Sequence, residues 1–360
     1  MKQLKQTLTV CLLVVASATL GAQDIHFSQF YMSPLNLNPA MTGVMNCNIR
    51  LVANYRNQWA SVLRTNSFRT YSVSYDQRIP VGRYDYFGVG GTFWGDRAGE
   101  ADFATLTGKL SFSYSKKMGG SKRGDGQYLV VGAEAGAAQR SIDFLNLRWG
   151  TQHDGRGSFD STLPSQEDKF DRDNFLFADL AAGLLWFSVF ENGSNFYAGA
   201  AFHHLNRANT SFVGPDNPLV QDGTVDEDLL YSRYTVHAGG EFRINPKVGI
   251  VPGVIYMNQG PSYQLNAGTS IKFLLGNARD NQAFHIGLWG RIASELEDGF
   301  LTDAAIISTR FDFNDLSLSF SYDINISPLQ PASNGQGSFE FGMIYKICGM
   351  QRRNVYCPDF

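Results

Sequence analysis

After its first 22 residues, the sequence has no uninterrupted apolar run of the roughly 20 residues that a transmembrane helix needs. The nearest candidate, residues 175–190, contains Asp179 and is too short to span a bilayer comfortably. The chain also lacks an excess of charge, because 30 Lys and Arg residues stand against 33 Asp and Glu residues. An inner-membrane helical protein is therefore excluded, and the net charge of -3 gives no support for nucleic-acid binding.

Motifs for metal binding are missing as well. The chain has no C-x-x-C and no H-x-x-x-H motif, so none of its histidines has the spacing of a metal site. The six histidines are His26, His153, His203, His204, His237 and His285. We therefore predict no metal and no cofactor. His203 and His204 are neighbours on a predicted strand, so we expect their side chains to point to opposite faces of the sheet.

One loop invites a catalytic interpretation. His153 and Asp154 stand close to Ser158 and Asp160, and hydrolases built on barrels place such residues at the barrel rim. Loop residues of these types are usually only solvated, so we predict no catalytic residue and no enzyme. The acidic run at residues 222–228 lacks the D-x-D-x-D-G spacing of a calcium loop, and we interpret it as a charged external surface.

The first 22 residues have the features of a secretory signal peptide. Lys2 and Lys5 precede a short apolar run at residues 8–16, and small residues stand just before Gln23. We expect cleavage after Ala22.

The mature chain is rich in glycine and aromatic residues, and its clearest segments alternate. In residues 316–325 every second residue is apolar, while Ser, Asp and Asn occupy the positions between. Aromatics spaced along the whole chain suit strands that begin and end in aromatic girdles. This pattern predicts an all-β fold, a transmembrane antiparallel β-barrel, with a soluble β-sandwich or propeller as the alternative.

About fourteen segments read as strands, an even number as in bacterial single-chain barrels. The predicted strands are 47–58, 66–78, 84–95, 102–116, 127–138, 174–188, 195–206, 230–243, 247–257, 263–274, 282–293, 302–312, 315–326 and 337–347. The barrel is thus expected over residues 47–347, followed by a tail at 348–360.

Loop lengths favour the outer membrane over a soluble fold. The long connections 139–173 and 207–229 fall at one end, and the short ones at 79–83, 244–246 and 314–315 fall at the other. Outer-membrane barrels have short periplasmic turns and long external loops. We therefore predict a multi-pass outer-membrane barrel with both termini in the periplasm.

The segment at residues 23–46 comes before the first strand. Pro34 and Pro39 exclude a long helix or a central strand, so we expect an irregular element that is either a partner-binding segment or a plug. Its partner-binding candidates are His26, Phe27, Ser28, Gln29, Phe30, Tyr31, Ser33, Pro34, Asn38 and Pro39, of which the aromatics are expected to be exposed. In the alternative, the segment is a plug packed in the lumen against Arg50, Asn54 and Arg56.

Three cysteines remain after the signal peptide. In an oxidising compartment we expect a disulfide, and our preferred pair is Cys348 with Cys357, which closes the short tail. Cys47 with Cys348 is the alternative, because the first and last strands of a closed barrel are neighbours. Either pair fixes the tail at the periplasmic rim.

Several motifs along the mature chain resemble one known family. They are Asp24–Phe30, Ser33–Ala40, Asn54–Trp59, Ser74–Asp76, Ser321–Ser327, Gly337–Glu340 and Cys357–Phe360. Together they look like the PorP/SprF family of outer-membrane proteins, which is associated with the type IX secretion and gliding apparatus of Bacteroidetes-type bacteria. Ile25 and Asp359 depart from the family pattern, where Pro and Arg are usual.

The resemblance implies a barrel that assists export or surface attachment of secreted proteins such as adhesins. Its implied partners are periplasmic and outer-membrane components of type IX secretion, the secreted cargo and the lipid bilayer. The alternative function is an outer-membrane channel for hydrophobic or small solutes, because a barrel of this size can enclose a channel.

Overall fold

The computed structural model describes residues 24–82, 84–120, 125–147, 149–153, 158–160, 162–164, 170, 172–214, 228–275, 282–295, 299–349 and 357–358. The expected signal peptide lies outside the described residues, as do Asp154 and residues 222–227 of the acidic run.

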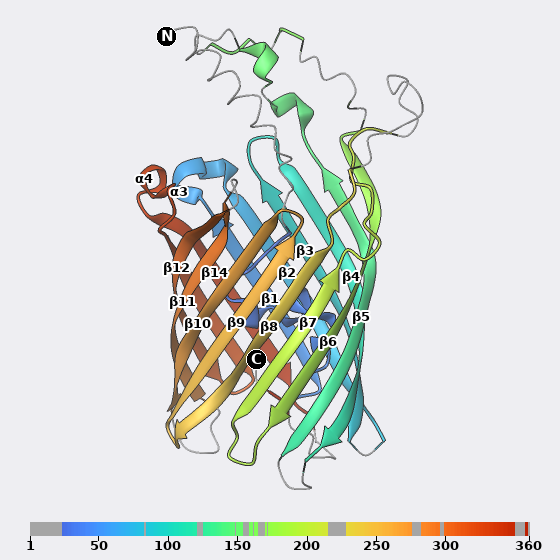
Figure 1. The fold of residues 1–360 in the computed structure, drawn as a ribbon, viewed down its shortest axis with the longest axis vertical. Helices are drawn as coiled ribbons and strands as arrows, with labels where there is room; N and C mark the ends of the chain where they lie inside the picture. Colours follow the sequence, from blue (N-terminus) through green and yellow to red (C-terminus); the bar gives the residue numbers. More distant parts are fainter. Residues whose placement is uncertain are drawn as a thin grey trace.

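The described residues form a closed antiparallel barrel of fourteen strands (Figure 1). The strands are β1 (Ile49–Gln58), β2 (Phe68–Val81), β3 (Asp85–Ala98), β4 (Phe103–Gly119), β5 (Gly126–Ser141), β6 (Asn174–Val189), β7 (Asn195–His203), β8 (Arg233–Asn245), β9 (Val248–Gln259), β10 (Ser262–Leu275), β11 (Gln282–Glu295), β12 (Gly299–Phe313), β13 (Leu316–Asn325) and β14 (Gln336–Ile347). Each strand pairs with its neighbour in sequence, and β1 closes the ring on β14. The predicted antiparallel barrel is confirmed.

Alternation along each strand separates two faces of the wall. In β13, Leu318 and Phe320 are exposed, whereas Ser319, Ser321 and Asp323 are buried. The exposed residues form an apolar outer surface suited to lipid, and the buried polar residues line the lumen. Among the described residues, no helix is long and apolar enough to cross a membrane.

The connections divide the barrel into two mouths. At the mouth that we call the loop mouth lie the described parts of the long β5–β6 and β7–β8 connections, together with the short helices α3 (Ala60–Leu63) and α4 (Gln330–Ser333) (Figure 1). The 3₁₀ turns η3 (Arg64–Asn66), η4 (Phe144–Asn146) and η5 (Gly150–Gln152) lie in the same connections. At the opposite turn mouth, strands such as β8 and β9, or β12 and β13, are joined by two residues.

The N-terminal segment crosses the lumen from one mouth to the other. Asp24 contacts Gln259, His204 and Arg233 at the loop-mouth ends of β9, β7 and β8, whereas Cys47 lies at the turn mouth before β1. On its way the segment forms η1 (Phe30–Met32), α2 (Pro34–Leu37) and η2 (Pro39–Met41), and the prolines stand at the first helical positions, where no backbone N–H is needed.

The two ends of the described chain therefore lie at opposite mouths, because Cys357 contacts Asn46 at the turn mouth. This placement of the described ends disagrees with the expectation that both termini share one side of the membrane; the termini themselves lie outside the described residues. The physical reason is that a segment passing once through the lumen reverses the side from which the chain starts.

The disulfide joins Cys47 to Cys348, with a Cα–Cα distance of 4.3 Å. The preferred pairing of Cys348 with Cys357 is wrong, and the alternative is the one observed. Ile49 and Ile347 are partners in the β1–β14 ladder, so barrel closure itself places the two flanking cysteines side by side. Asp315 lies close to this pair, but a cluster whose sulfurs form a disulfide offers no thiolate to a metal.

Candidate functional site

Residues Asp24–Asn46 form a plug inside the barrel, and we use that name for them. Phe27 and Phe30 are only 6% and 4% exposed, and Met32, Ala40 and Met41 are fully buried. The expectation of exposed aromatics at a partner interface is therefore wrong for these residues. They are buried because the lumen of a fourteen-stranded barrel is wide enough to hold a folded segment.

All three residues predicted to face the lumen contact the plug. The Arg50 guanidinium donates to the Met41 carbonyl at 3.0 Å and pairs with Asp76 at 2.8 Å. The Asn54 amide donates to the Met32 carbonyl at 3.1 Å. Because wall side chains satisfy plug carbonyls, the plug keeps its irregular backbone without unpaired buried groups at these points.

The densest contact is centred on Ser28. Its hydroxyl donates to Asp323 at 2.7 Å and accepts from Arg56 at 2.9 Å and from Arg291 at 2.8 Å. The backbone N–H groups of Ser28 and the following residue donate to the two carboxylate oxygens of Glu340 at 2.6 and 3.0 Å. The hydroxyl thus makes one donated and two accepted bonds, which is its full capacity.

We call these five residues the Ser28 cluster: Ser28, Arg56, Arg291, Asp323 and Glu340. Its members come from the plug and from strands β1, β11, β13 and β14, so they are up to 312 residues apart in sequence. Charge-assisted hydrogen bonds are roughly twice as strong as neutral ones, and this effect is largest where water is excluded. The Ser28 cluster therefore fixes the plug to the first and last strands of the barrel.

The part of the plug nearest the turn mouth is held by shape in addition to the hydrogen bonds from Arg50. Three glycines in strands β3, β5 and β6 face it: Gly88, Gly132 and Gly183. A Cβ atom at Gly88 would overlap the Thr42 carbonyl, and one at Gly183 would overlap the Asn38 side chain. Glycine at these positions lets the plug backbone lie directly against the wall.

Asn38 shows how close that approach is. Its amide donates to the backbone carbonyls of Leu184 at 3.0 Å and Ala200 at 3.2 Å, and its carbonyl caps η2 by accepting from the Ala40 N–H at 2.8 Å. One asparagine therefore joins two neighbouring strands to the plug. Around it, Leu37, Ala40, Met41 and Val44 pack in one apolar cluster with Tyr86, Tyr128, Leu185 and Phe187.

The end of the plug at the loop mouth is held by charge. Asp24 lies 2.6 Å from His204 and 3.1 Å from Arg233, and His204 also lies 2.8 Å from Asp179. Burial alone would raise the pKa of the Asp24 carboxyl, but the positive charges of His204 and Arg233 hold it well below its usual value. Burial would lower the pKa of His204, but Asp24 and Asp179 raise it to about 9.

His203 and His204 are both buried, so the expectation that they point to opposite faces is wrong. Strand β7 ends at His203, and the positive φ of 55° at His204 breaks the alternation and turns that side chain inward. No local sequence signal marked His204 as a plug contact, because its partner Asp24 is 180 residues away.

The loop residues that invited a catalytic interpretation do not form such a site among the described residues. The His153 ring lies 5.3 Å from the Phe159 ring, and the Asp160 carboxylate accepts from Thr162. These contacts fold the loop on itself.

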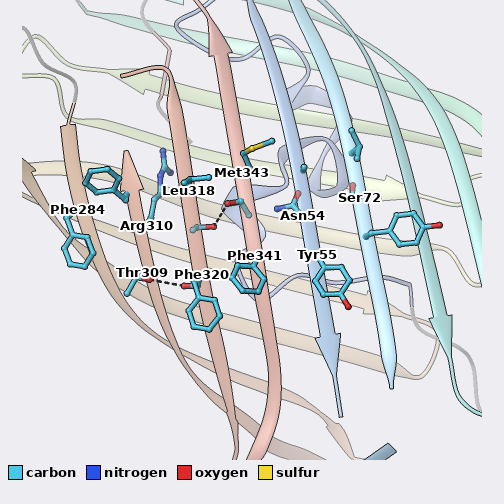
Figure 2. A pocket seen from close by; sticks show the side chains of 16 residues that line it. Asn54, Tyr55, Ser72, Phe284, Thr309, Arg310, Leu318, Phe320, Phe341 and Met343 are labelled. Atoms are coloured by element: carbon cyan, nitrogen blue, oxygen red, sulfur yellow. Dashed lines mark hydrogen bonds between the residues drawn. The ribbon is translucent and has the colours of Figure 1, made fainter. Parts of the chain in front are cut away.

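The outer wall carries an apolar hollow of about 590 Å³ across strands β1, β2 and β11 to β14. Figure 2 shows the rings of Tyr55, Phe284, Phe320 and Phe341 along it. All four of these side chains are exposed on the lipid-facing side, whereas Asn54 is buried on the other side of the wall. The hollow therefore belongs to the membrane-facing surface and is separate from the lumen.

A closed barrel with an apolar outer wall and a folded segment in its lumen defines the class: an outer-membrane β-barrel with a built-in plug. A family model described as "Type IX secretion system membrane protein PorP/SprF" matches residues 19–345, and the chain belongs to this family. A search of curated proteins gives no match.

Three solved structures resemble this chain at low similarity. CdiB from Acinetobacter baumannii matches with 9% identity and a TM-score of 0.45, over 84% of this chain and 60% of that one. The toluene transporter TbuX of Ralstonia pickettii matches with 11% identity and a TM-score of 0.42, over 92% and 96% of the two chains. The toluene transporter TodX of P. putida gives 10% identity and a TM-score of 0.41, over 88% and 93%.

Proposed function

We propose that this protein is a closed outer-membrane component of the type IX secretion and gliding apparatus, which assists export or surface attachment of secreted proteins such as adhesins. In this proposal the protein acts through its two mouths and does not conduct solutes. Family membership supports the secretion role. The plug supports the closed state, and it is the observation that carries the proposal.

Two features favour a plug that stays in place. The Ser28 cluster holds it with buried charges, and the glycine-lined wall fits its backbone. Two cavities between plug and wall, near Asp24 and near Phe27, measure about 20 and 30 Å³, which is room for single water molecules. A segment so closely fitted suits a permanent structural element, so we assign the former partner-binding candidates to the plug.

The loop mouth offers a surface for cargo. The two long connections are joined there by aromatic contacts, since the Phe144 ring stacks on Phe170 at 5.4 Å and lies 5.8 Å from Phe212. Phe212 in turn lies 5.0 Å from Phe175 of β6. Aromatic side chains supply large contact areas in protein interfaces. We propose that these joined loops face the cell exterior and meet the exported protein.

The turn mouth faces the periplasm in this proposal, because outer-membrane barrels have their short turns on that side. Periplasmic components of the secretion system would then meet the ends of β8 to β14 and the disulfide.

Quantitative proteomics of the cell surface and the medium tests the function. Comparing a strain that lacks this protein with its parent, we expect one or a few large surface proteins to disappear and to accumulate inside the cell. Loss of all type IX cargo would indicate a general component instead. Unchanged secretion would overturn the proposal and leave solute transport as the leading account.

A further inference from the structure

A further cavity, of about 170 Å³, lies at the turn mouth beside the plug. Its lining comes from strands β8 and β10 to β14, from the turn between β12 and β13, and from the residues next to the disulfide. The lining residues are Asn46, Cys47, Arg243, Lys272, Leu274, Ala283, Arg310, Asp312, Asn314, Asp315, Ser317, Lys346 and Cys348. Unlike the two small cavities along the plug, this one has room for about five water molecules.

The charges of this cavity do not cancel. Four cationic side chains line it, namely Arg243, Lys272, Arg310 and Lys346, and two carboxylates, Asp312 and Asp315, stand among them. A third carboxylate, Glu241, pairs with Lys272 at 2.7 Å. Among the described residues, the four positive charges therefore exceed the three negative charges by one in this part of the mouth.

Arg243 is the most accessible of these cations. Its side chain is 46% exposed and lies 4.0 Å from Glu241, a long and weak contact. Arg310, by contrast, is held by Asp312 at 2.7 Å. An exposed guanidinium that lines the same cavity as the half-buried Lys272 ammonium group matches the two oxygens of a carboxylate.

In the described part of the structure, the plug and the tail meet this cavity at one side only, where Asn46 and Cys348 line it and Cys357 hydrogen-bonds to Asn46. Cys357 packs in one apolar cluster with Tyr86 and Phe187, and its Sγ lies 3.6 Å from the Arg78 guanidinium. These residues belong to strands β2, β3 and β6, on the other side of the ring from β10 to β13.

We propose that this cavity binds an acidic segment of a periplasmic component of the secretion system, through one or two Asp or Glu side chains. The volume suits such side chains, and the excess positive charge selects carboxylates. The Arg243 guanidinium pairs with the carboxylate of the bound segment. The Lys272 ammonium group pairs with this carboxylate and with Glu241. The inference rests on the proposed function in one respect: the turn mouth must face the periplasm.

The first test measures binding of a synthetic peptide to the purified full chain in detergent micelles. The probe is an eight-residue peptide of alternating Asp and Ser with a fluorescent label, and its partner has Asn in place of each Asp. We expect saturable binding of the Asp peptide that weakens with added salt, and no binding of the Asn peptide. Equal binding of both peptides would overturn the proposal.

Substitutions locate the site. Arg243→Glu should lower the affinity for the Asp peptide about tenfold, because it replaces attraction by repulsion. Arg243→Lys should lower this affinity less. Lys247→Glu is the matched control, because Lys247 is an exposed cation in the adjacent β8–β9 turn that does not line the cavity. If Lys247→Glu has the same effect as Arg243→Glu, general surface charge explains the binding and the proposal fails.

A chain ending at Pro358 tests the competing occupant, the chain's own last two residues. We expect its affinity for the Asp peptide to equal that of the full chain. A rise of about tenfold would mean that the last two residues of the chain occupy the cavity, and would overturn the proposal. Loss of cargo from the surface of a deletion strain, together with absent peptide binding, would reject only this inference.

Discussion

The two ends of the plug are held in different ways. The end at the loop mouth, Asp24 to Gln29, is fixed by ion pairs and charge-assisted hydrogen bonds from Arg56, Arg233 and Arg291. The part from Asn38 to Met45 also accepts hydrogen bonds from Arg50 and Arg78, but it lies against glycines and packs in an apolar cluster. The hold on the loop-mouth end therefore depends on pH and on each charged partner. The hold on the part from Asn38 to Met45 depends on close packing and is disturbed by added side-chain volume.

The largest expected effect comes from breaking the Ser28 cluster. Arg56→Met removes the guanidinium that pairs with Glu340 at 2.7 Å and leaves a buried carboxylate undercompensated. Removing one partner of a buried ion pair typically costs about 3–5 kcal/mol. We expect the urea midpoint for unfolding in detergent micelles to fall accordingly, and an unchanged midpoint would show that the cluster does not hold the plug.

Adding volume at the other end should have a smaller effect. Gly183→Val places side-chain atoms where the Asn38 side chain lies, and overpacking of this kind costs about 1–3 kcal/mol. Gly290→Val in β11 is the matched control, because a Cβ atom there meets no atom within 4 Å. Equal unfolding midpoints for the two variants would contradict a glycine-fitted wall.

The pH dependence separates the two ends without substitution. The pKa of His204 is raised from 6.5 to about 9, so its contribution is fully present below about pH 6.5 and is lost as the pH rises through about 9. The pKa of Asp24 is lowered, so its contribution is present above its usual value of 3.8 and is lost as the pH falls further.

Hydrogen exchange followed by mass spectrometry measures this pH dependence at each end of the plug. After correction for intrinsic exchange rates, residues 24–29 should be best protected between about pH 4 and 6.5 and lose protection towards pH 9. Residues 38–45 should keep theirs. Parallel loss in both segments would show that the ends are not held independently.

The smallest effect is expected at Tyr31, between the two ends. Its hydroxyl makes one long hydrogen bond of 3.3 Å to Ser308, while its ring stacks on Trp289 at 5.3 Å. Tyr31→Phe keeps the ring and removes the bond, so we expect a loss of about 0.5–1 kcal/mol in the free energy of unfolding. A loss as large as that of Arg56→Met would contradict the expectation that the charged contacts of the Ser28 cluster matter more than the Tyr31 hydrogen bond.

Much of the fold was predictable from the sequence because the barrel depends on local alternation. All fourteen predicted strands are present, with ends within three residues of those observed. The lumen position of Arg50, Asn54 and Arg56 followed from the same alternation. These features need only the period of two in a strand and the lengths of the loops.

The site was less predictable, because it depends on contacts between distant residues. Nothing local relates Ser28 to Glu340, or Asp24 to His204. One signal was present in the sequence: Gly88 stands in a glycine cluster inside a strand, and such a glycine often marks close approach of another backbone. The disulfide shows the same limit, since barrel closure decided between two pairings that the sequence left open.

The most direct test of the account is the conductance of the purified barrel in planar lipid bilayers. We compare the full chain with a variant that keeps the signal peptide but lacks residues 24–41. We expect the full chain to be silent and the variant to open stable pores. Pores of equal conductance from both proteins would show that the plug does not close the lumen, and would contradict the central claim.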